Sequence, residues 1–157
     1  MKLRNATLAD ADFVLALRND PVTRAMSIGR RQVPRTVHEA WFHAHHVDIL
    51  IAEEKGVKVG VFRSDPSRRE EWPRQSHVRA ADVSVAVAPE ARGRGLGFAL
   101  IRMGTQAQFR RGYDACVAVI RLENAASLRA FLRAGYEWCR TDDVGRVRVA
   151  ILTCEKS

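Results

Sequence analysis

Long hydrophobic runs are scarce in this chain of 157 residues. The longest, such as residues 115–120 (ACVAVI), fall well short of the roughly 18 apolar residues that a membrane-spanning helix needs. Asp10 and Asp12 interrupt the N-terminal segment where a secretory signal would require a continuous apolar stretch. We therefore expect a cytoplasmic protein with no membrane partner.

Cysteine is also scarce, with only three residues, Cys116, Cys139 and Cys154. Their odd number, wide spacing and lack of a Cys-x-x-Cys pair indicate neither a disulfide framework nor a zinc ribbon, so we expect buried free thiols. Of the histidines, only His43 and His46 share a helical face at short spacing, and no acidic residue joins them there. This pattern does not favour a metal site.

Lysine contributes little to the positive charge, since 22 of the 26 basic residues are arginine. The net charge of +8 attracts polyanions, which include nucleic acids and phosphate-rich small molecules alike. Because the arginines are scattered along the chain and form no basic block, we expect no nucleic-acid partner. The sequence has no internal repeat, no low-complexity tract and no Gly/Ser linker, which favours a single domain over residues 1–157.

Apolar periodicity predicts an α/β fold with a mixed, mostly antiparallel sheet of six to seven strands and about four flanking helices. Expected helices cover 8–18 after Thr7, 36–46 after the capping box of Thr36 and Glu39, a stretch after residue 95, and 124–135. Asp20-Pro21 should end the first helix, and Ser64 to Arg79 reads as a loop. Expected strands are 2–7, 48–53, 57–63, 81–88, 115–121, 136–141 and 145–154.

The expected helices also carry apolar positions that we assign to the core. In the second helix these are Val37, Trp41 and Phe42. The remaining assignments are Leu96, Leu100, Met103 and Ala107 in the third helix, and Leu128, Phe131 and Leu132 in the fourth.

A glycine-rich turn lies between the strand 81–88 and the third helix. Arg92-Gly93-Arg94-Gly95-Leu96-Gly97 places three glycines at alternate positions, and the next strand follows closely enough to complete a parallel βαβ unit. Bare main-chain amides at a helix N-terminus attract anions, and glycines let a phosphate approach them. We therefore interpret the turn as a phosphate cradle, to which Arg92 and Arg94 add positive charge.

Two common phosphate-binding motifs do not match this turn. A Walker A loop would close with Gly-Lys-Ser/Thr, whereas this one closes with Gly97-Phe98-Ala99. The dinucleotide fingerprint would need glycine at position 98. The pattern Arg/Gln-x-x-Gly-x-Gly/Ala does match, at Arg92, Gly95 and Gly97.

With this pattern the segment 82–136 resembles the GNAT family of acyl-CoA-dependent N-acetyltransferases. The match covers VAVAPEARGRGLG at 85–97 and the later Asn-led block NAASLRAFLRAGY at 124–136. The resemblance implies acetyl-CoA as cofactor, a βαβ acyl-CoA-binding core, and a strand 82–88 that splays from the strand 115–121. The cofactor-binding residues that it implies are Val85, Val87, Arg92, Gly93, Arg94, Gly95, Leu96, Gly97, Phe98, Asn124, Ser127 and Phe131.

Acetyl transfer to an amine needs a group that removes a proton, because alkyl amines are mostly protonated near neutral pH. Strand alternation places Asp82 and Ser84 on one face, and the family often carries an acid near this place, so we take both as catalytic candidates with Asp82 as base. Glu71 and His77 are reserves. The resemblance implies a backbone amide near Val87 as oxyanion donor and a general-acid tyrosine where this chain has Phe131.

The acceptor is expected to be a small amine. Leu17-Arg18-Asn19-Asp20-Pro21 and His38-Glu39-Ala40-Trp41-Phe42 resemble patterns in GNAT enzymes for nucleotide-linked amino sugars and for ribosomal proteins, which makes Arg18, Asn19 and Trp41 candidate substrate-binding residues. Arg18, Arg24, Arg30 and Arg31 would then be candidate contacts for nucleotide phosphates. A protein N-terminal acetyltransferase and a non-catalytic CoA-binding sensor remain alternatives, and a homodimer remains open.

Overall fold

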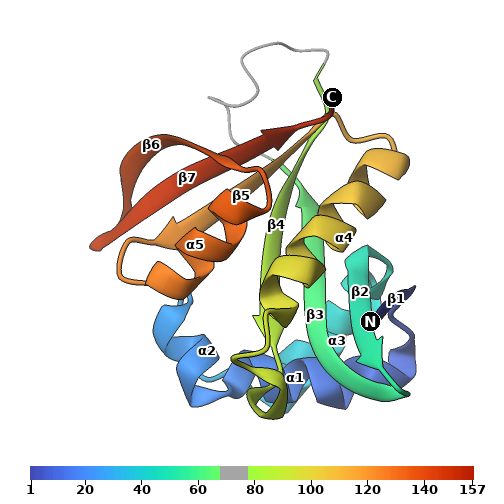
Figure 1. The fold of residues 1–157 in the computed structure, drawn as a ribbon. Helices are drawn as coiled ribbons and strands as arrows, with labels where there is room; N and C mark the ends of the chain where they lie inside the picture. The colour runs from blue at the N-terminus through green and yellow to red at the C-terminus, as the bar shows by residue number, and fades with distance from the viewer. Residues whose placement is uncertain (68–77) are drawn as a thin grey trace.

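The computed structural model describes residues 1–67 and 78–157. The seven strands within these residues form one mixed sheet in the order β1-β2-β3-β4-β5-β7-β6. Every neighbouring pair is antiparallel except β4 and β5, which are parallel. Helix α4 connects these two strands, which gives the expected βαβ unit (Figure 1). The strands are β1 Lys2–Asn5, β2 Ile49–Glu54, β3 Val57–Pro66, β4 Ala80–Val87, β5 Ala115–Arg121, β6 Glu137–Val144 and β7 Val147–Glu155.

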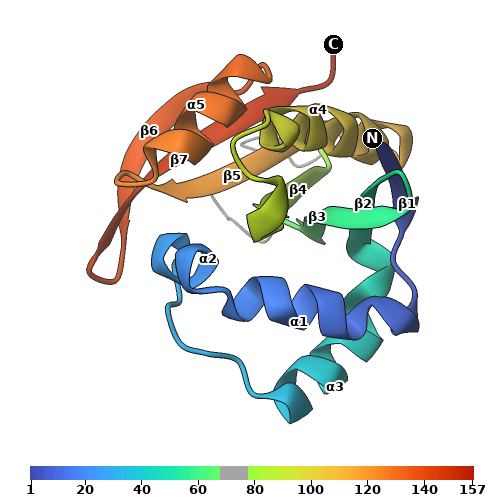
Figure 2. The same ribbon diagram turned by 60° about the horizontal axis from the view of Figure 1, so that its bottom comes forward.

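Helices cover both faces of this sheet. Figure 2 shows α1, α2 and α3 on one face and α4 and α5 on the other. Their bounds are α1 Ala11–Asn19, α2 Pro21–Met26, α3 Arg35–His45, α4 Leu96–Arg110 and α5 Ala125–Arg133, with short 3-10 turns at Leu8–Asp10, His46–Asp48 and Pro89–Ala91. The sheet and the helices of both layers confirm the α/β fold expected from the sequence.

Turn chemistry explains several boundaries in the sequence. Asn124 caps α5 by accepting a hydrogen bond from the Ser127 amide at 3.2 Å, and Gly135 follows that helix with a φ of 100°. Lys55 and Gly56, both with positive φ, close the β2–β3 hairpin. Asp20 ends α1 as predicted, but it also caps a short helix, α2, that the sequence reading did not include.

Three helical details differ from the expectation. The helix α3 begins at Arg35, after an extended Pro34, so the predicted capping box at Thr36 is wrong. Val37 is 59% exposed, and His38 takes its place in the core because its Nε2 bonds the carbonyl oxygen of Ala11 at 2.8 Å. Leu132 is likewise exposed, which leaves Phe131 as the buried residue of α5.

The expected loop and core also need correction. Strand β3 runs to Pro66, so the start of the predicted loop at Ser64 is strand, and Ser64 itself is buried against Gln108 of α4. The buried face of α4 is centred on Leu100, Ile101, Gly104, Thr105, Gln108 and Phe109, with Leu96 and Ala107 at its margin and Met103 only partly buried. The three cysteines are free, but only Cys116 is fully buried and Cys139 is exposed.

Candidate active site

The central feature of the site is a divergence of the two parallel strands. β4 and β5 pair only over Ala80–Asp82 and residues 115–117, after which β4 continues alone on β3 while β5 continues on β7 (Figure 1). The amide of Ala88 donates to Val59 on β3 at 2.8 Å. Because backbone groups alternate in direction along a strand, those of Val85 and Val87 point away from β3 into the opening. The splay implied by the sequence resemblance is therefore present.

The glycine-rich turn lies at the end of β4, where this opening is widest. Gly93 and Gly95 both have a φ of 76°, and a Cβ added to either would have no protein atom within 4 Å. Within the described part of the chain, no acceptor bonds the main-chain amides of residues 93–98. This row of N–H groups without acceptors opens the fifteen-residue helix α4, an arrangement that favours an anion.

The arginine side chains of the turn are engaged by the protein itself. Arg92 donates from Nε to the carbonyl oxygen of Val87 at 3.2 Å and from Nη2 to Asp20 at 2.6 Å. The hydrogen bond from Arg92 lowers the pKa of Asp20. Arg94 pairs with Glu54 at the β2–β3 hairpin. Both side chains therefore position the turn, and its amides are the groups left to face an anion.

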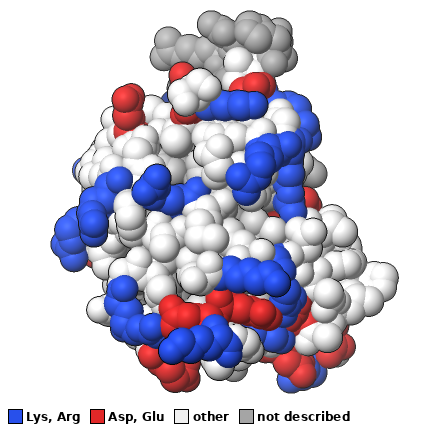
Figure 3. All heavy atoms as spheres, turned by 45° about the vertical axis from the view of Figure 1, so that its right-hand side comes forward, with Lys and Arg blue, Asp and Glu red and all other residues white. Residues whose placement is uncertain are grey.

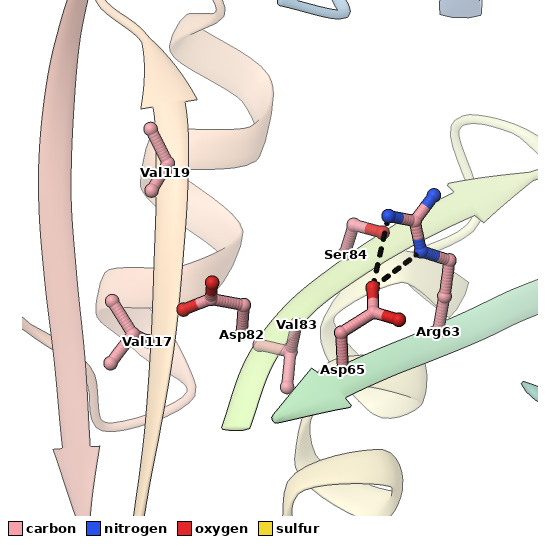
Figure 4. Close-up of a pocket in the computed structure, with 7 residues that line it drawn as sticks. All are labelled: Arg63, Asp65, Asp82, Val83, Ser84, Val117 and Val119. Atoms are coloured by element: carbon pink, nitrogen blue, oxygen red, sulfur yellow. Dashed lines mark hydrogen bonds and ion pairs between the residues drawn. The ribbon is translucent and has the colours of Figure 1, made fainter. Parts of the chain in front are cut away.

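Asp82 and Ser84 line a cavity of about 200 Å³ on the face of the sheet that α1–α3 cover. Its other lining residues are Arg63, Asp65, Val83, Val117 and Val119. Figure 4 shows Asp82 directed from β4 toward Val117 of β5, and the ion pair of Arg63 and Asp65 beside Ser84. The two candidates that strand alternation placed on one face thus do share one cavity, beside the opening of the strands.

Helix α5 places its candidates differently. Asn124 serves as the expected N-cap, and Ser127 is partly exposed one turn into the helix. Phe131 is only 2% exposed and packs edge-on against Tyr136, with ring centroids 4.9 Å apart. The ring thus belongs to the core beneath the helix, and the expected contact of Phe131 with the cofactor stays a prediction.

Tyr136, which packs against Phe131, does not replace the missing tyrosine. The hydroxyl of Tyr136 is buried and lies 2.7 Å from Thr105 on α4. Burial raises its pKa well above the usual value for tyrosine. Neither aromatic residue of this pair therefore presents a proton to the opening.

Two of the candidate substrate-binding residues, Arg18 and Trp41, contact each other. The guanidinium carbon of Arg18 lies 4.5 Å from the ring centroid of Trp41, and Arg18 Nη1 is 3.1 Å from Nδ1 of His38. Since His38 Nε2 bonds a carbonyl oxygen, it carries the proton and Nδ1 accepts from Arg18. Desolvation of this packed ring lowers the pKa of His38, which favours the neutral form. Trp41 remains half-buried, with its ring also approached by Arg63 at 5.2 Å.

Asn19, the third acceptor-side candidate, is engaged elsewhere. Its side-chain amide bonds both the amide and the carbonyl of Val33, at 2.7 and 2.9 Å, and so pins the segment before α3. Arg24 and Arg30 donate to main-chain carbonyls of the 25–30 turn, and Arg30 also pairs with Glu123. These contacts explain local structure, and the predicted contacts with nucleotide phosphates gain no support from them.

Sequence reasoning missed Arg63 and Asp65. These residues are identified by the strand register, in which Arg63 lies opposite Ser84 and Asp65 opposite Asp82. A long connection separates β3 from β4 in the sequence, so no local pattern predicts this register. The reserve residues Glu71 and His77 lie outside the described residues. Figure 3 shows basic side chains spread in separate groups, with acidic ones between some of them, in keeping with many arginines that pair with carboxylates.

Comparison with known proteins decides the family. The model of the acetyltransferase (GNAT) family matches residues 15–136, which is most of the chain. The chain belongs to the GNAT family. It is an acetyl-CoA-dependent N-acetyltransferase, in agreement with the splayed strands and the glycine turn. No helix among the described residues is long and apolar enough to cross a membrane.

Individual GNAT relatives are moderately similar. An L-methionine sulfoximine/L-methionine sulfone acetyltransferase from Pseudomonas paraeruginosa is 30% identical over 139 residues, which cover 86% of this chain and 79% of that protein. The crystal structure of a ribosomal-protein-alanine N-acetyltransferase from Brucella melitensis superposes with a TM-score of 0.81 at 26% identity, covering 99% and 100% of the two chains. The yncA protein from Salmonella typhimurium, solved with its cofactor acetyl-CoA, gives a TM-score of 0.79 at 26% identity and covers 98% and 92%.

Proposed function

We propose that this enzyme acetylates the primary amine of a small, amino-acid-like acceptor of the methionine sulfoximine or sulfone class. The observation that carries the proposal is the cavity at Asp82, whose volume of about 200 Å³ suits a small molecule and whose polar side chains are two carboxylates, one hydroxyl and one guanidinium. The Pseudomonas relative, which acetylates such acceptors, supports it. A nucleotide-linked amino sugar has less support, because Arg24 and Arg30 serve the 25–30 turn.

Binding of the cofactor is assigned to main-chain groups. The amides of residues 93–98 would hold the diphosphate, and the exposed edge of β4 at Val85 and Val87 would pair with the pantetheine arm. When bound, acetyl-CoA supplies a thioester whose acyl carbon accepts the amine. The fit rests on the bare amides and on the two glycines whose missing Cβ atoms leave the cradle open.

Asp82 is proposed as the base that takes the proton from the acceptor ammonium. Its carboxylate projects into the opening, and Ser84, two residues along the same strand, can hold the amine by a hydrogen bond (Figure 4). The amides of Val85 and Val87 are directed into the same opening, where fixed donors stabilise an oxygen that gains negative charge. Because a thiol has a pKa of about 8.5, the leaving group can depart without a dedicated acid, which is consistent with Phe131.

The acceptor class is tested by turnover with a panel of amines. The panel contains methionine sulfoximine, methionine sulfone, a nucleotide-linked amino sugar and a peptide with N-terminal alanine, and acetylated products are measured by mass spectrometry. Mass detection is preferable to a thiol reagent, because the exposed Cys139 would react with the reagent. We expect the highest kcat/KM for the two methionine derivatives. A clear preference for the sugar or the peptide contradicts the proposal, and tight acetyl-CoA binding without any product favours a sensor.

The role of Asp82 is tested by Asp82→Asn. An amide cannot take a proton, so kcat should fall on the order of 10²- to 10⁴-fold while acetyl-CoA binding is kept. Ser84→Ala, on the same face, is the matched control and should lower kcat much less. Equal losses in the two variants would contradict Asp82 as base.

A further inference from the structure

Arg63 is the only cation that lines the cavity among the described residues. Its side chain is 41% exposed and projects from β3 on the face shared with Ser84 and Asp82 (Figure 4). Asp65 accepts its Nε at 3.0 Å and pairs with Nη2 at 3.0 Å, both through the single oxygen Oδ2. Within the described residues no acceptor bonds Nη1, so this nitrogen of a cavity-lining residue keeps its donors for a ligand.

The ring of Trp41, on α3, contacts this guanidinium and limits its movement. The guanidinium carbon lies 5.2 Å from the ring centroid, and Arg18 lies 4.5 Å from the same centroid while it bonds His38. Contact with an aromatic face orients an arginine and reduces the freedom that it loses when it binds a planar anion. Trp41 and Asp65 thus hold Arg63 ready for a carboxylate.

Strand register sets the distance between Arg63 and the proposed base. Arg63 is directly opposite Ser84, so it is diagonal to Asp82. Diagonal neighbours on antiparallel strands lie about 7–8 Å apart, and direct neighbours about 4.5–5.5 Å. A long arginine side chain and a carboxylate at this separation can together hold a molecule whose ammonium and carboxylate share one carbon atom.

We propose that Arg63 is the anchor for the carboxylate of the acceptor, and that it selects α-amino acids over simple amines. This inference rests on the proposed function. The acceptor's carboxylate would bind Nη1, and its amine would then lie beside Ser84 and Asp82. Asp65 keeps the guanidinium in place and its charge offsets part of that of Arg63, so the site as a whole attracts a zwitterion instead of a free anion.

The test compares two acceptors that differ only in the carboxylate. These are methionine sulfone and its decarboxylated amine, 3-(methylsulfonyl)propylamine, assayed with wild type and Arg63→Gln. We expect Arg63→Gln to raise KM for methionine sulfone about tenfold to a hundredfold, because a charge-assisted pair is lost, and to change KM for the amine less than about threefold. Arg63→Lys should recover part of the affinity for methionine sulfone.

Matched variants and a binding measurement separate the outcomes. Arg110→Gln, an exposed arginine at the end of α4, should leave both KM values unchanged. Calorimetric titration of methionine sulfone into the coenzyme A complex of each variant should show the same ranking as KM. Equal changes of KM for both acceptors, or none, overturn the anchor while the proposed function stands. If wild type neither binds nor acetylates methionine sulfone, the proposed function itself fails.

Discussion

Gly93 and Gly95 hold the left-handed backbone that shapes the turn at the start of α4. For any other residue this conformation costs about 1–2 kcal/mol, and a side chain would project into the space that we propose for the diphosphate. The two glycines are therefore needed for the shape of the backbone and for access to the amides. They form the part of the site that depends least on side-chain chemistry.

Gly95→Ala should impair cofactor binding more than folding. A Cβ at Gly95 meets no protein atom within 4 Å, so the unfolding free energy should fall only by the backbone strain, about 1–2 kcal/mol. Gly145→Ala is the matched control, because Gly145 also has positive φ and open space but lies in the β6–β7 turn. Thermal unfolding should show stabilisation by saturating acetyl-CoA in wild type and Gly145→Ala, and little in Gly95→Ala. Equal stabilisation in both variants would contradict the cradle.

Residues that act through local chemistry were predictable from the sequence. Asn124 as helix cap and the glycines of the turn belong to this group, because their roles depend on the nearest few residues. Arg63 and His38 were not predictable, since their roles depend on which strand or helix lies opposite. For Phe131 the position in the motif was correct, but its burial against Tyr136 depends on the packing of α5 on the sheet.

At the scale of elements, the close packing of α4 on β3 determines the position of the glycine-rich turn at the start of α4. Gly104 lies over the buried ring of Phe62, and a Cβ there would come within 2.2–2.4 Å of ring atoms. Two positions further along the strand, Ser64 bonds Gln108 at 3.1 Å. This close contact along α4 fixes the height of its first turn above β4.

Gly104→Ala should destabilise the protein although alanine is the better helix former. The clash with Phe62 must be relieved by moving either the ring or the helix, which should lower the unfolding free energy by about 1–3 kcal/mol. Chemical denaturation measures this change. Adding Phe62→Leu should recover part of the loss, so that the double variant is more stable than the two single changes predict by addition. Strict additivity would argue against the clash.

The sequence predicted whether a segment is helix or strand better than it predicted where strands end and how they pair. Hydrophobic periodicity gave every strand and the parallel pairing of β4 with β5, but β3 was expected to end before Ser64. The helix α2 was missed, because six residues are too few for a clear period. The register of β3 against β4, on which the cavity depends, is set by packing over a long connection, which no local pattern reveals.

At the scale of the whole molecule, an ionic cluster ties the N-terminal segment to the sheet. Asp10 is 1% exposed and is bonded by Arg4 of β1 at 2.8 Å, by Lys58 of β3 at 2.7 Å and by the amide of Thr7 at 2.8 Å. The hydrogen bond from Arg4, with those from Lys58 and Thr7, holds the pKa of Asp10 well below its usual value. The cluster therefore anchors the entry to α1, the helix that carries Arg18.

Acidification should weaken the molecule through this cluster. Because the folded-state pKa of Asp10 is lowered, its contribution is complete above about pH 4 and is lost as the pH falls further. Asp10→Asn should cost about 2–3 kcal/mol at pH 7, and its deficit relative to wild type should shrink toward pH 2 in urea titrations. Asp12→Asn, which removes an exposed pair with Arg35, should cost much less than Asp10→Asn at pH 7, because solvent screens that pair. A deficit for Asp10→Asn that does not change with pH would contradict this account.

The parting of β4 from β5 leaves a seam inside the sheet that no strand of residues 1–67 and 78–157 closes. If the pantetheine arm lies there, it hydrogen-bonds to β4 in place of a neighbouring strand. The amides of Val85 and Val87 should then exchange hydrogen with solvent more slowly once the cofactor is bound. Hydrogen bonding across the sheet would then be complete only while the cofactor is bound, and the protein would become less stable each time coenzyme A leaves.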